Sequence, residues 1–212
     1  MTRLKGKIML NNANKLSSYE KIIDALAQEI ARLYEVCGAL DEIVKQTNDH
    51  PEIYKRFGRF FYTSYLHNYH ELYYGISRLV DDTKGVISII KLLQMKDEDK
   101  PAGRIEFAKI EKELVNRIKK NKNLKKIKDF KNNKLGHKNK WLVLDELAEI
   151  EFRENNKLSI EDMESLLHFL SDILKKVSER VGFHVLTIPI TPIRLEISTL
   201  FKCCLLTNKI KF

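Results

Sequence analysis

The chain has 212 residues, of which 43% are hydrophobic and 32% charged, and its formal net charge is +9 at pH 7. This length suits one domain with a full core, and eight Gly with four Pro suit long helices better than an all-β or loop-rich protein. The three cysteines form no CxxC pair and no zinc-site spacing, and no apolar run makes a signal-peptide core or approaches the roughly 20 residues of a membrane span. We therefore expect a cytoplasmic protein with an N-terminal arm at 1–16, a helical-bundle domain at 17–182 and a C-terminal tail at 183–212.

Apolar residues at alternating spacings of three and four predict a first long helix over about residues 17–47. Ser17 and Glu20 have the capping-box form at its start. At 1.5 Å per residue this helix is about 45 Å long, enough to run the length of a bundle. Cys37 lies in the apolar seam, so we expect it to be a small core residue and not a reactive thiol. The seam consists of Ile23, Leu26, Ile30, Leu33, Cys37, Leu40 and Val44.

A second helix is predicted over about residues 52–80, because Pro51 suits the first helical position and apolar residues recur on one face. Ser64 and Asn68 project onto that same face at 100° per residue. A buried Asn68 amide must be satisfied. It would form a hydrogen bond to another helix or belong to a polar site inside the bundle. The apolar face consists of Phe57, Phe61, Tyr65, Leu72, Ile76 and Leu79.

His67 and Glu71 lie four residues apart on one face of this helix, beside His70, which is a spacing that two metal ligands could use. However, His70 projects to a different side, and no second ligand cluster with suitable spacing follows in the sequence. We therefore expect these residues at the surface or packed against aromatic rings. We expect no metal ion and no other cofactor.

Two shorter helices are predicted next, over residues 84–95 and about 105–120, with a polar turn that contains Pro101 between them. The second of these leads directly into a basic stretch. There, apolar residues at helical spacing predict a buried edge, and Gly136 suits the end of the helix. The buried edge consists of Leu124, Ile127 and Phe130 or Lys131.

Ser159 to Asp162 would cap a last long helix, whose apolar seam repeats the three-four spacing. Two such seams at opposite ends of the chain predict an all-α antiparallel bundle in which the first and last helices pack. Pro189 and Pro192 exclude a regular helix after Gly182. The tail is therefore predicted to be an irregular or short β-like strand pair, an arm over a partner subunit, or disordered. The seam consists of Ile160, Met163, Leu167, Leu170, Leu174, Val177 and Val181.

Residues 117–140 hold eleven Lys or Arg and a single acid, Asp129, so they carry +10, while the rest of the chain sums to −1. Such a run is often only a solvated helix face. It contains His137, however, which is the only one of the six histidines inside a cationic run. Surrounding cations favour the neutral imidazole, which can accept a proton. Cleavage of an RNA phosphodiester needs such a base, an acid, and a cation for the charge that develops at phosphorus.

Lys131 and Asn132 precede the histidine and would supply a cation and a donor for phosphate oxygens. On an unbroken helix Lys131 and His137 would lie roughly 120° apart, because they are separated by six steps of 100°. The two side chains can meet only if the helix loosens near Gly136 or if they converge across a symmetric dimer. We favour the dimer.

The segment KNNKLGH resembles the signature of the HEPN superfamily, in which an arginine is followed after four to six residues by a histidine. The polar residue that often follows the arginine would be Asn132, and the small residue before His137 would be Gly136. The flanking segments ISRLVDDTKGVISIIKLL and KLSIEDMESLLHFLSDILKKV also resemble the U-type HEPN group associated with bacterial abortive infection. The family arginine would be Lys131, a point charge in place of a bidentate fork. The likeness covers roughly residues 20–182.

This resemblance implies a helical bundle, commonly a homodimer, and for many members a metal-independent ribonuclease that serves as a toxin or phage-defence effector. It implies that His137 transfers protons, Lys131 stabilises the phosphate and Asn132 assists. Two alternatives stay open: a bundle that binds nucleic acid without cutting it, and a bundle whose seams bind an antitoxin or another protein partner. The lysines that we expect to hold the RNA backbone are Lys125, Lys128, Lys134, Lys138 and Lys140.

Overall fold

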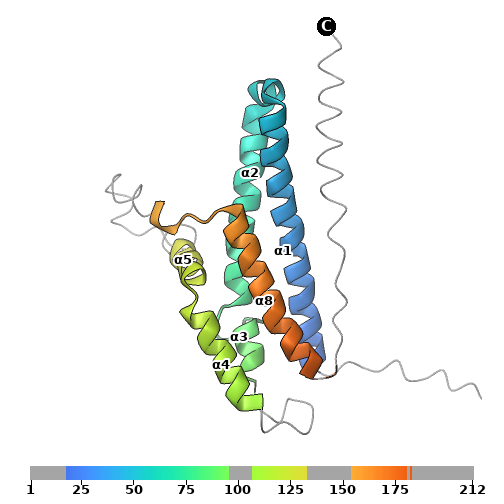
Figure 1. Ribbon diagram of the computed structural model, residues 1–212, viewed down its shortest axis with the longest axis vertical. Coiled ribbons are helices and arrows are strands. Elements are labelled where there is room, and N and C mark those ends of the chain that lie inside the picture. Colours follow the sequence, from blue (N-terminus) through green and yellow to red (C-terminus); the bar gives the residue numbers. More distant parts are fainter. Residues whose placement is uncertain (1–17, 96–106, 133–153, 181, 183–212) are drawn as a thin grey trace, which may run out of the picture.

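The computed structural model describes residues 18–95, 107–132, 154–180 and 182, and these residues form helices joined by turns, with no strand among them (Figure 1). The predicted all-α class is therefore confirmed. None of the helices in these ranges combines the length and apolar character that a membrane crossing requires. The arm at 1–16 and the tail at 183–212 lie outside the described residues, so the division of the chain stays a prediction. The helices are α1 (Ser18–Asp49), α2 (Pro51–Leu79), α3 (Ile89–Leu93), α4 (Phe107–Lys120), α5 (Lys122–Phe130) and α8 (Ile160–Arg180).

Helices α1 and α2 form a long antiparallel hairpin whose turn is at His50 (Figure 1). Both lie within two residues of the predicted bounds, and Pro51 is the first residue of α2, where its missing N–H costs nothing. The predicted seam of α1 is buried as far as Leu40. The prediction that Val44 belongs to the buried seam was wrong, because its side chain is 36% exposed and the neighbouring Ile43 is buried instead. Helix α8 begins near Cys37, seven residues before Val44, since Cys37 Sγ lies 3.9 Å from the Ile160 carbonyl oxygen. Among the described helices, the hairpin of α1 and α2 extends beyond α8 and α5 (Figure 1).

Helix α8 runs antiparallel to α1 and packs along it, as the two apolar seams predicted (Figure 1). The predicted cap is also present. The backbone N–H of Asp162 donates to Ser159 Oγ at 3.0 Å, and the Ser159 N–H donates to Asp162 Oδ2 at 3.2 Å. This reciprocal pair satisfies two of the backbone donors that the first turn of α8 leaves open.

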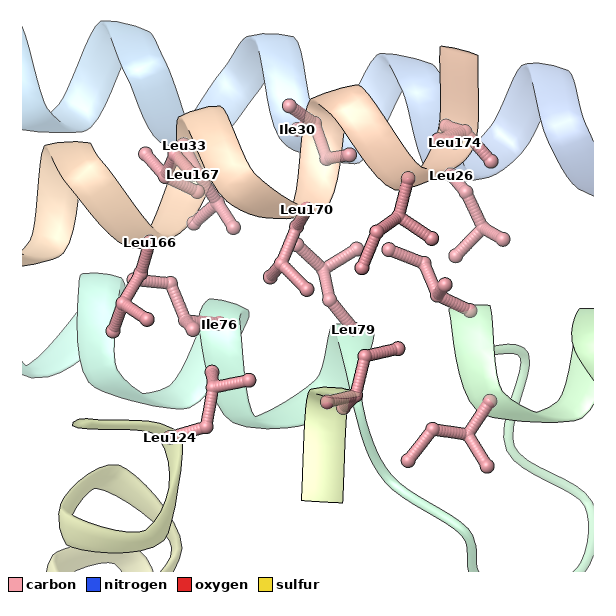
Figure 2. Packing of buried hydrophobic residues seen from close by; sticks show 14 of the residues in the cluster. Leu26, Ile30, Leu33, Ile76, Leu79, Leu124, Leu166, Leu167, Leu170 and Leu174 are labelled. Carbon is pink, nitrogen blue, oxygen red and sulfur yellow. The ribbon is translucent and has the colours of Figure 1, made fainter. Parts of the chain in front are cut away.

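Leucine and isoleucine side chains from α1, α2, α5 and α8 meet in one core, which Figure 2 shows from close by. The Leu33 side chain of α1 packs directly against Gly75 of α2, where an added Cβ would lie only 2.2 Å from Leu33 Cδ2. Only glycine therefore allows this contact without displacing Leu33. The labelled core residues, each less than 5% exposed, are Leu26, Ile30, Leu33, Ile76, Leu79, Leu124, Leu166, Leu167, Leu170 and Leu174.

The helix predicted at 84–95 is shorter than expected, since α3 begins only at Ile89. Gly85 has φ +86° in a turn that precedes it, a conformation that interrupts a helix. Ser88 then caps α3, because its hydroxyl accepts a hydrogen bond from the Lys91 N–H at 3.2 Å. The interpretation of Asn68 was also wrong. Its amide donates at 2.9 Å to the Ser64 carbonyl one turn earlier in its own helix.

The sequence predicted that the helix at 105–120 leads directly into the basic stretch. The structure instead has a break between α4 and α5. Asn121 ends α4 and caps α5, because its Oδ1 accepts hydrogen bonds from the N–H groups of Asn123 and Leu124 at 3.0 and 3.1 Å. Asparagine favours this position because its short side chain reaches the open donors of the first turn. The buried edge of α5 is confirmed: Leu124, Ile127 and Phe130 are each at most 9% exposed.

Candidate functional site

The expected site residues divide into two groups. Lys131 and Asn132 of the HEPN-like motif are described by the structure, as are Lys125 and Lys128 of the expected RNA-binding set. The remaining expected residues lie outside the described part of the chain, so their contacts stay predictions. They are Lys134, His137, Lys138 and Lys140.

All four of the described site residues line one pocket of about 450 Å³. Lys125 and Lys128 belong to α5, and Lys131 and Asn132 directly follow it. Spacings of three and four residues place these side chains on one side of the helix, above one another. The opposite walls come from the end of α2, the loop after it, Ile90 of α3 and the end of α4.

The pocket carries net positive charge although it is not lined by cations alone. Four lysines line it, and Lys119 at the end of α4 is the one that the sequence analysis did not name. Two aspartates, Asp81 and Asp82, line it as well, so the lining carries four positive and two negative charges, or +2. A hollow lined by an excess of positive charge raises the local concentration of anions.

Lys131 is ion-paired across the pocket. Its Nζ donates to Asp81 Oδ2 at 3.1 Å, and the two side chains are 26% and 16% exposed. Asp81 is itself fixed in the turn after α2, because its Oδ1 accepts from the Thr83 N–H at 2.9 Å. Burial acts to raise the pKa of Asp81, but hydrogen bonds from Thr83 and Lys131 outweigh it and lower the pKa to about 2. The carboxylate is therefore ionised at neutral pH.

Asp81 was not expected from the sequence to be a site residue. It lies 50 positions before Lys131, with Asp82 directly after it. Two acids between helices give no local signal of a partner so far along the chain. The pairing became visible only when the turn after α2 was placed against α5.

Two tyrosines of α2, Tyr69 and Tyr73, connect α2 to the end of α5 and to the segment before α8. The ring of Tyr73 packs against Phe130, the residue before Lys131, with centroids 4.8 Å apart. The Tyr73 hydroxyl accepts from the Leu158 N–H at 2.9 Å and donates to the Asn156 carbonyl at 3.0 Å. Tyr69 lies one turn earlier, with its hydroxyl 3.1 Å from that of Tyr73. Burial raises the pKa of both tyrosines, so they remain neutral hydrogen-bonding groups.

Lys131 and Asn132 begin a π turn directly after α5, and such turns occur often at functional sites. Lys131 itself keeps the direction of α5, because its angles are α-helical, φ −55° and ψ −50°, and its N–H donates to the Ile127 carbonyl. The angle between Lys131 and His137 involves residues outside the described part of the chain, so it stays a prediction.

The histidine and glutamate group on α2 serves the fold. Glu71 Oε1 accepts from Arg32 Nη2 at 2.9 Å, which joins α2 to α1, and Arg32 also pairs with Glu29 of its own helix at 2.8 Å. Burial, followed by the neighbouring His67, lowers the pKa of His70. Within the described ranges no three His, Cys, Asp or Glu side chains lie close enough together to hold a metal ion.

Comparison with known proteins gives one family match. The model of the family described as AbiU2, a HEPN family, matches residues 16–189. The match includes every described helix and the motif segment from Lys131 to His137. No curated protein and no solved structure matches the chain.

Proposed function

Because the chain belongs to the AbiU2-type HEPN family, we propose that it is a metal-independent endoribonuclease of a toxin–antitoxin or anti-phage abortive-infection system. In this proposal His137 moves protons at the 2′-hydroxyl and the leaving oxygen, and Lys131 stabilises the charge on phosphorus. Asn132 assists by donating to a phosphate oxygen. RNA is the substrate, and a homodimer is the active form.

The observation that carries this proposal is the gathering of Lys125, Lys128, Lys131 and Asn132 around one positively charged pocket. Two of these residues belong to the family motif, and the other two extend the positive charge along α5. A phosphodiester backbone is recognised by such a row of cations whatever its base sequence. The first two residues of the motif thus lie beside further cations in an arrangement that suits the phosphates of an RNA strand.

The ion pair with Asp81 is compatible with phosphate binding by Lys131. A lysine ammonium has three N–H donors, and the contact with Asp81 Oδ2 uses one of them. The other two can point toward a phosphate in the pocket. Asp81 also restricts a long flexible side chain to one position, which reduces the conformational entropy that Lys131 loses when RNA binds.

Cleavage of RNA in the presence of EDTA tests the proposal. We expect the full-length protein to cut RNA, and His137→Ala to reduce the rate at least 100-fold, because a general acid or base contributes a factor of about 10² to 10⁴. Equal cleavage by both proteins would remove His137 from the mechanism. Lys176→Ala, which removes an exposed lysine of α8, is the matched control for loss of charge.

A second candidate function is RNA binding without cleavage. The observation that favours it is that a lysine paired with Asp81 stands where the family has an arginine. This reading predicts an affinity that falls with salt, with a log–log slope of about −0.7 for each phosphate neutralised, and no cleavage products. Lys131→Arg separates the two candidates: cleavage that appears only in this variant would assign the natural chain to the binding class.

A further inference from the structure

The first turns of α2, next to the turn of the hairpin, carry a second group of cations, separate from the pocket, while the adjoining residues 41–52 hold four acids and one lysine. We call residues 54–62, YKRFGRFFY, the hairpin tip; this segment contains three cations and no acid. It projects beyond α8 and α5 (Figure 1). Measured along α2, Phe60 lies about 30 Å from the pocket residue Val80, because twenty residues separate them at 1.5 Å each.

The hairpin tip exposes large aromatic side chains to water. Tyr54, Phe60 and Tyr62 are 43%, 57% and 56% exposed. Among the described residues, the large hydrophobic side chains that are exposed all lie at this end of the hairpin, with the exception of Ile87. Phe60 and Tyr62 lie two residues apart and so project to opposite sides of α2, flanking the buried Phe61. Exposed apolar groups that are concentrated in one segment mark a place where a partner binds.

The local backbone displays these rings outward. Ile53 and Phe61 are at most 2% exposed, so they form the contact with the core side of the hairpin. Phe57 has non-helical angles, φ −117° and ψ 18°, and kinks α2 between Tyr54 and Phe60. The kink changes the direction of the helix, so the rings on its two sides do not line up in a single narrow stripe.

The cations of the hairpin tip favour a nucleic acid over a second copy of the chain as the partner. In a symmetric contact between two copies of the tip, Lys55 and Arg59 would approach the same cations of the partner, which is unfavourable. A single-stranded nucleic acid satisfies both features at once, because its bases stack on aromatic rings while its phosphates pair with Lys and Arg. The Arg56 guanidinium already lies 5.4 Å from the Phe57 ring centroid, which is the cation–π arrangement that such surfaces use.

We infer that the hairpin tip is a binding site for single-stranded RNA, in which bases stack on Phe60, Tyr62 and Tyr54 and the phosphates contact Lys55 and Arg59. This inference rests on the proposed function in taking RNA as the ligand. In the proposed function the pocket on α5 holds phosphates, and no aromatic side chain is among the described residues that line it. The tip therefore contributes affinity for the bases of a strand that the pocket holds by its backbone.

The test compares two uncleavable strands of equal length, one of 2′-O-methyl RNA with bases and one abasic, bound to the full-length protein. We expect tighter binding of the strand with bases. The double variant Phe60→Ala with Tyr62→Ala should lose at least tenfold in affinity for that strand, since each stacked base contributes about that much, and lose nothing for the abasic strand. Tyr54→Ala, on the other side of the kink, should also lower the affinity for the strand with bases. Ile87→Ala, whose side chain is 57% exposed like that of Phe60, should bind both strands as the natural protein does.

Equal affinity of the double variant and the natural protein for the strand with bases would overturn the inference. So would a change in oligomeric state of the double variant by light scattering, because the tip would then be a contact between subunits. The proposed function is tested separately, by variants of the pocket and by cleavage. Lys125→Ala with Lys128→Ala should weaken binding of both strands if the pocket holds phosphates. Tip-dependent binding without any cleavage in EDTA would support the tip site and contradict the nuclease.

Discussion

The two ends of α2 differ in what surrounds them, although both are rich in large apolar residues. Near its C-terminal end, Leu72, Ile76 and Leu79 are at most 1% exposed, since α1, α5 and α8 all pack nearby. At the hairpin tip, Phe60 and Tyr62 are more than half exposed, although Ile53 and Phe61 of the same stretch are buried. Among the described helices, only α1 lies along this end of α2 (Figure 1). The number of neighbouring helices and the face of α2 on which a residue lies, and not the residue type, decide which side chain becomes core. We therefore expect substitutions at the two ends to act on different properties.

The largest difference should come from truncating one residue at each end. Ile76→Ala removes a side chain that is fully buried and should lower the free energy of unfolding by about 2–5 kcal/mol. Phe60→Ala removes a side chain that is 57% exposed and should change it by less than about 0.5 kcal/mol. Urea unfolding followed by circular dichroism measures both. Equal losses would mean that the tip is part of the folding core after all.

The two glycines of α2 should respond in opposite directions to alanine. At Gly75 the new Cβ would lie 2.2 Å from Leu33 Cδ2 in the core, so we expect a loss of about 1–3 kcal/mol from overpacking. At Gly58 its nearest neighbours would be ring carbons of Tyr54 at 3.7 Å, an ordinary contact. Gly58→Ala should therefore stabilise the helix by about 0.5 kcal/mol, through lower entropy of the unfolded chain. Thermal unfolding of the pair distinguishes these cases, and destabilisation at both positions would contradict the comparison.

Asp81→Asn tests the ion pair that joins the pocket end of α2 to α5. Since the pKa of Asp81 is depressed from an ordinary value of 3.8 to about 2, its contribution to stability is present above pH 4 and is lost as the pH falls toward 2. The variant should be less stable by about 1–2 kcal/mol at pH 7 and should lack this part of the acid dependence. It also raises the charge of the pocket lining from +2 to +3, and we expect this gain to outweigh the loss of a fixed position for Lys131, so RNA should bind more tightly. An unchanged acid profile would show that the pair contributes nothing to folding.

The smallest effect is expected at the exposed face of α8, which serves as a reference for surface charge. Lys175 and Glu179 lie 4.0 Å apart, with side chains 72% and 55% exposed. Water screens such a pair, so Glu179→Gln should change the free energy of unfolding by less than about 0.5 kcal/mol. A larger loss in chemical denaturation would indicate a contact of Glu179 beyond Lys175.

Local spacing in the sequence was sufficient to place the long helices. The alternation of three and four residues predicted helices at 17–47 and 52–80, and the structure has α1 at Ser18–Asp49 and α2 at Pro51–Leu79. The cap at Ser159 and Asp162 was found in the same way. These features depend on residues within one or two turns of each other, which is the range over which helix periodicity and capping act.

The sequence by itself thus determined the all-α class, the faces of the long helices and the basic row on α5. Only the tertiary structure decided that Val44 is exposed, that Asn68 bonds within its own helix, and that Asp81 reaches Lys131 from 50 positions away. The physical reason is one of range. Helix formation follows from neighbours a few residues apart, whereas burial and ion pairing depend on which distant segments the packed core brings together.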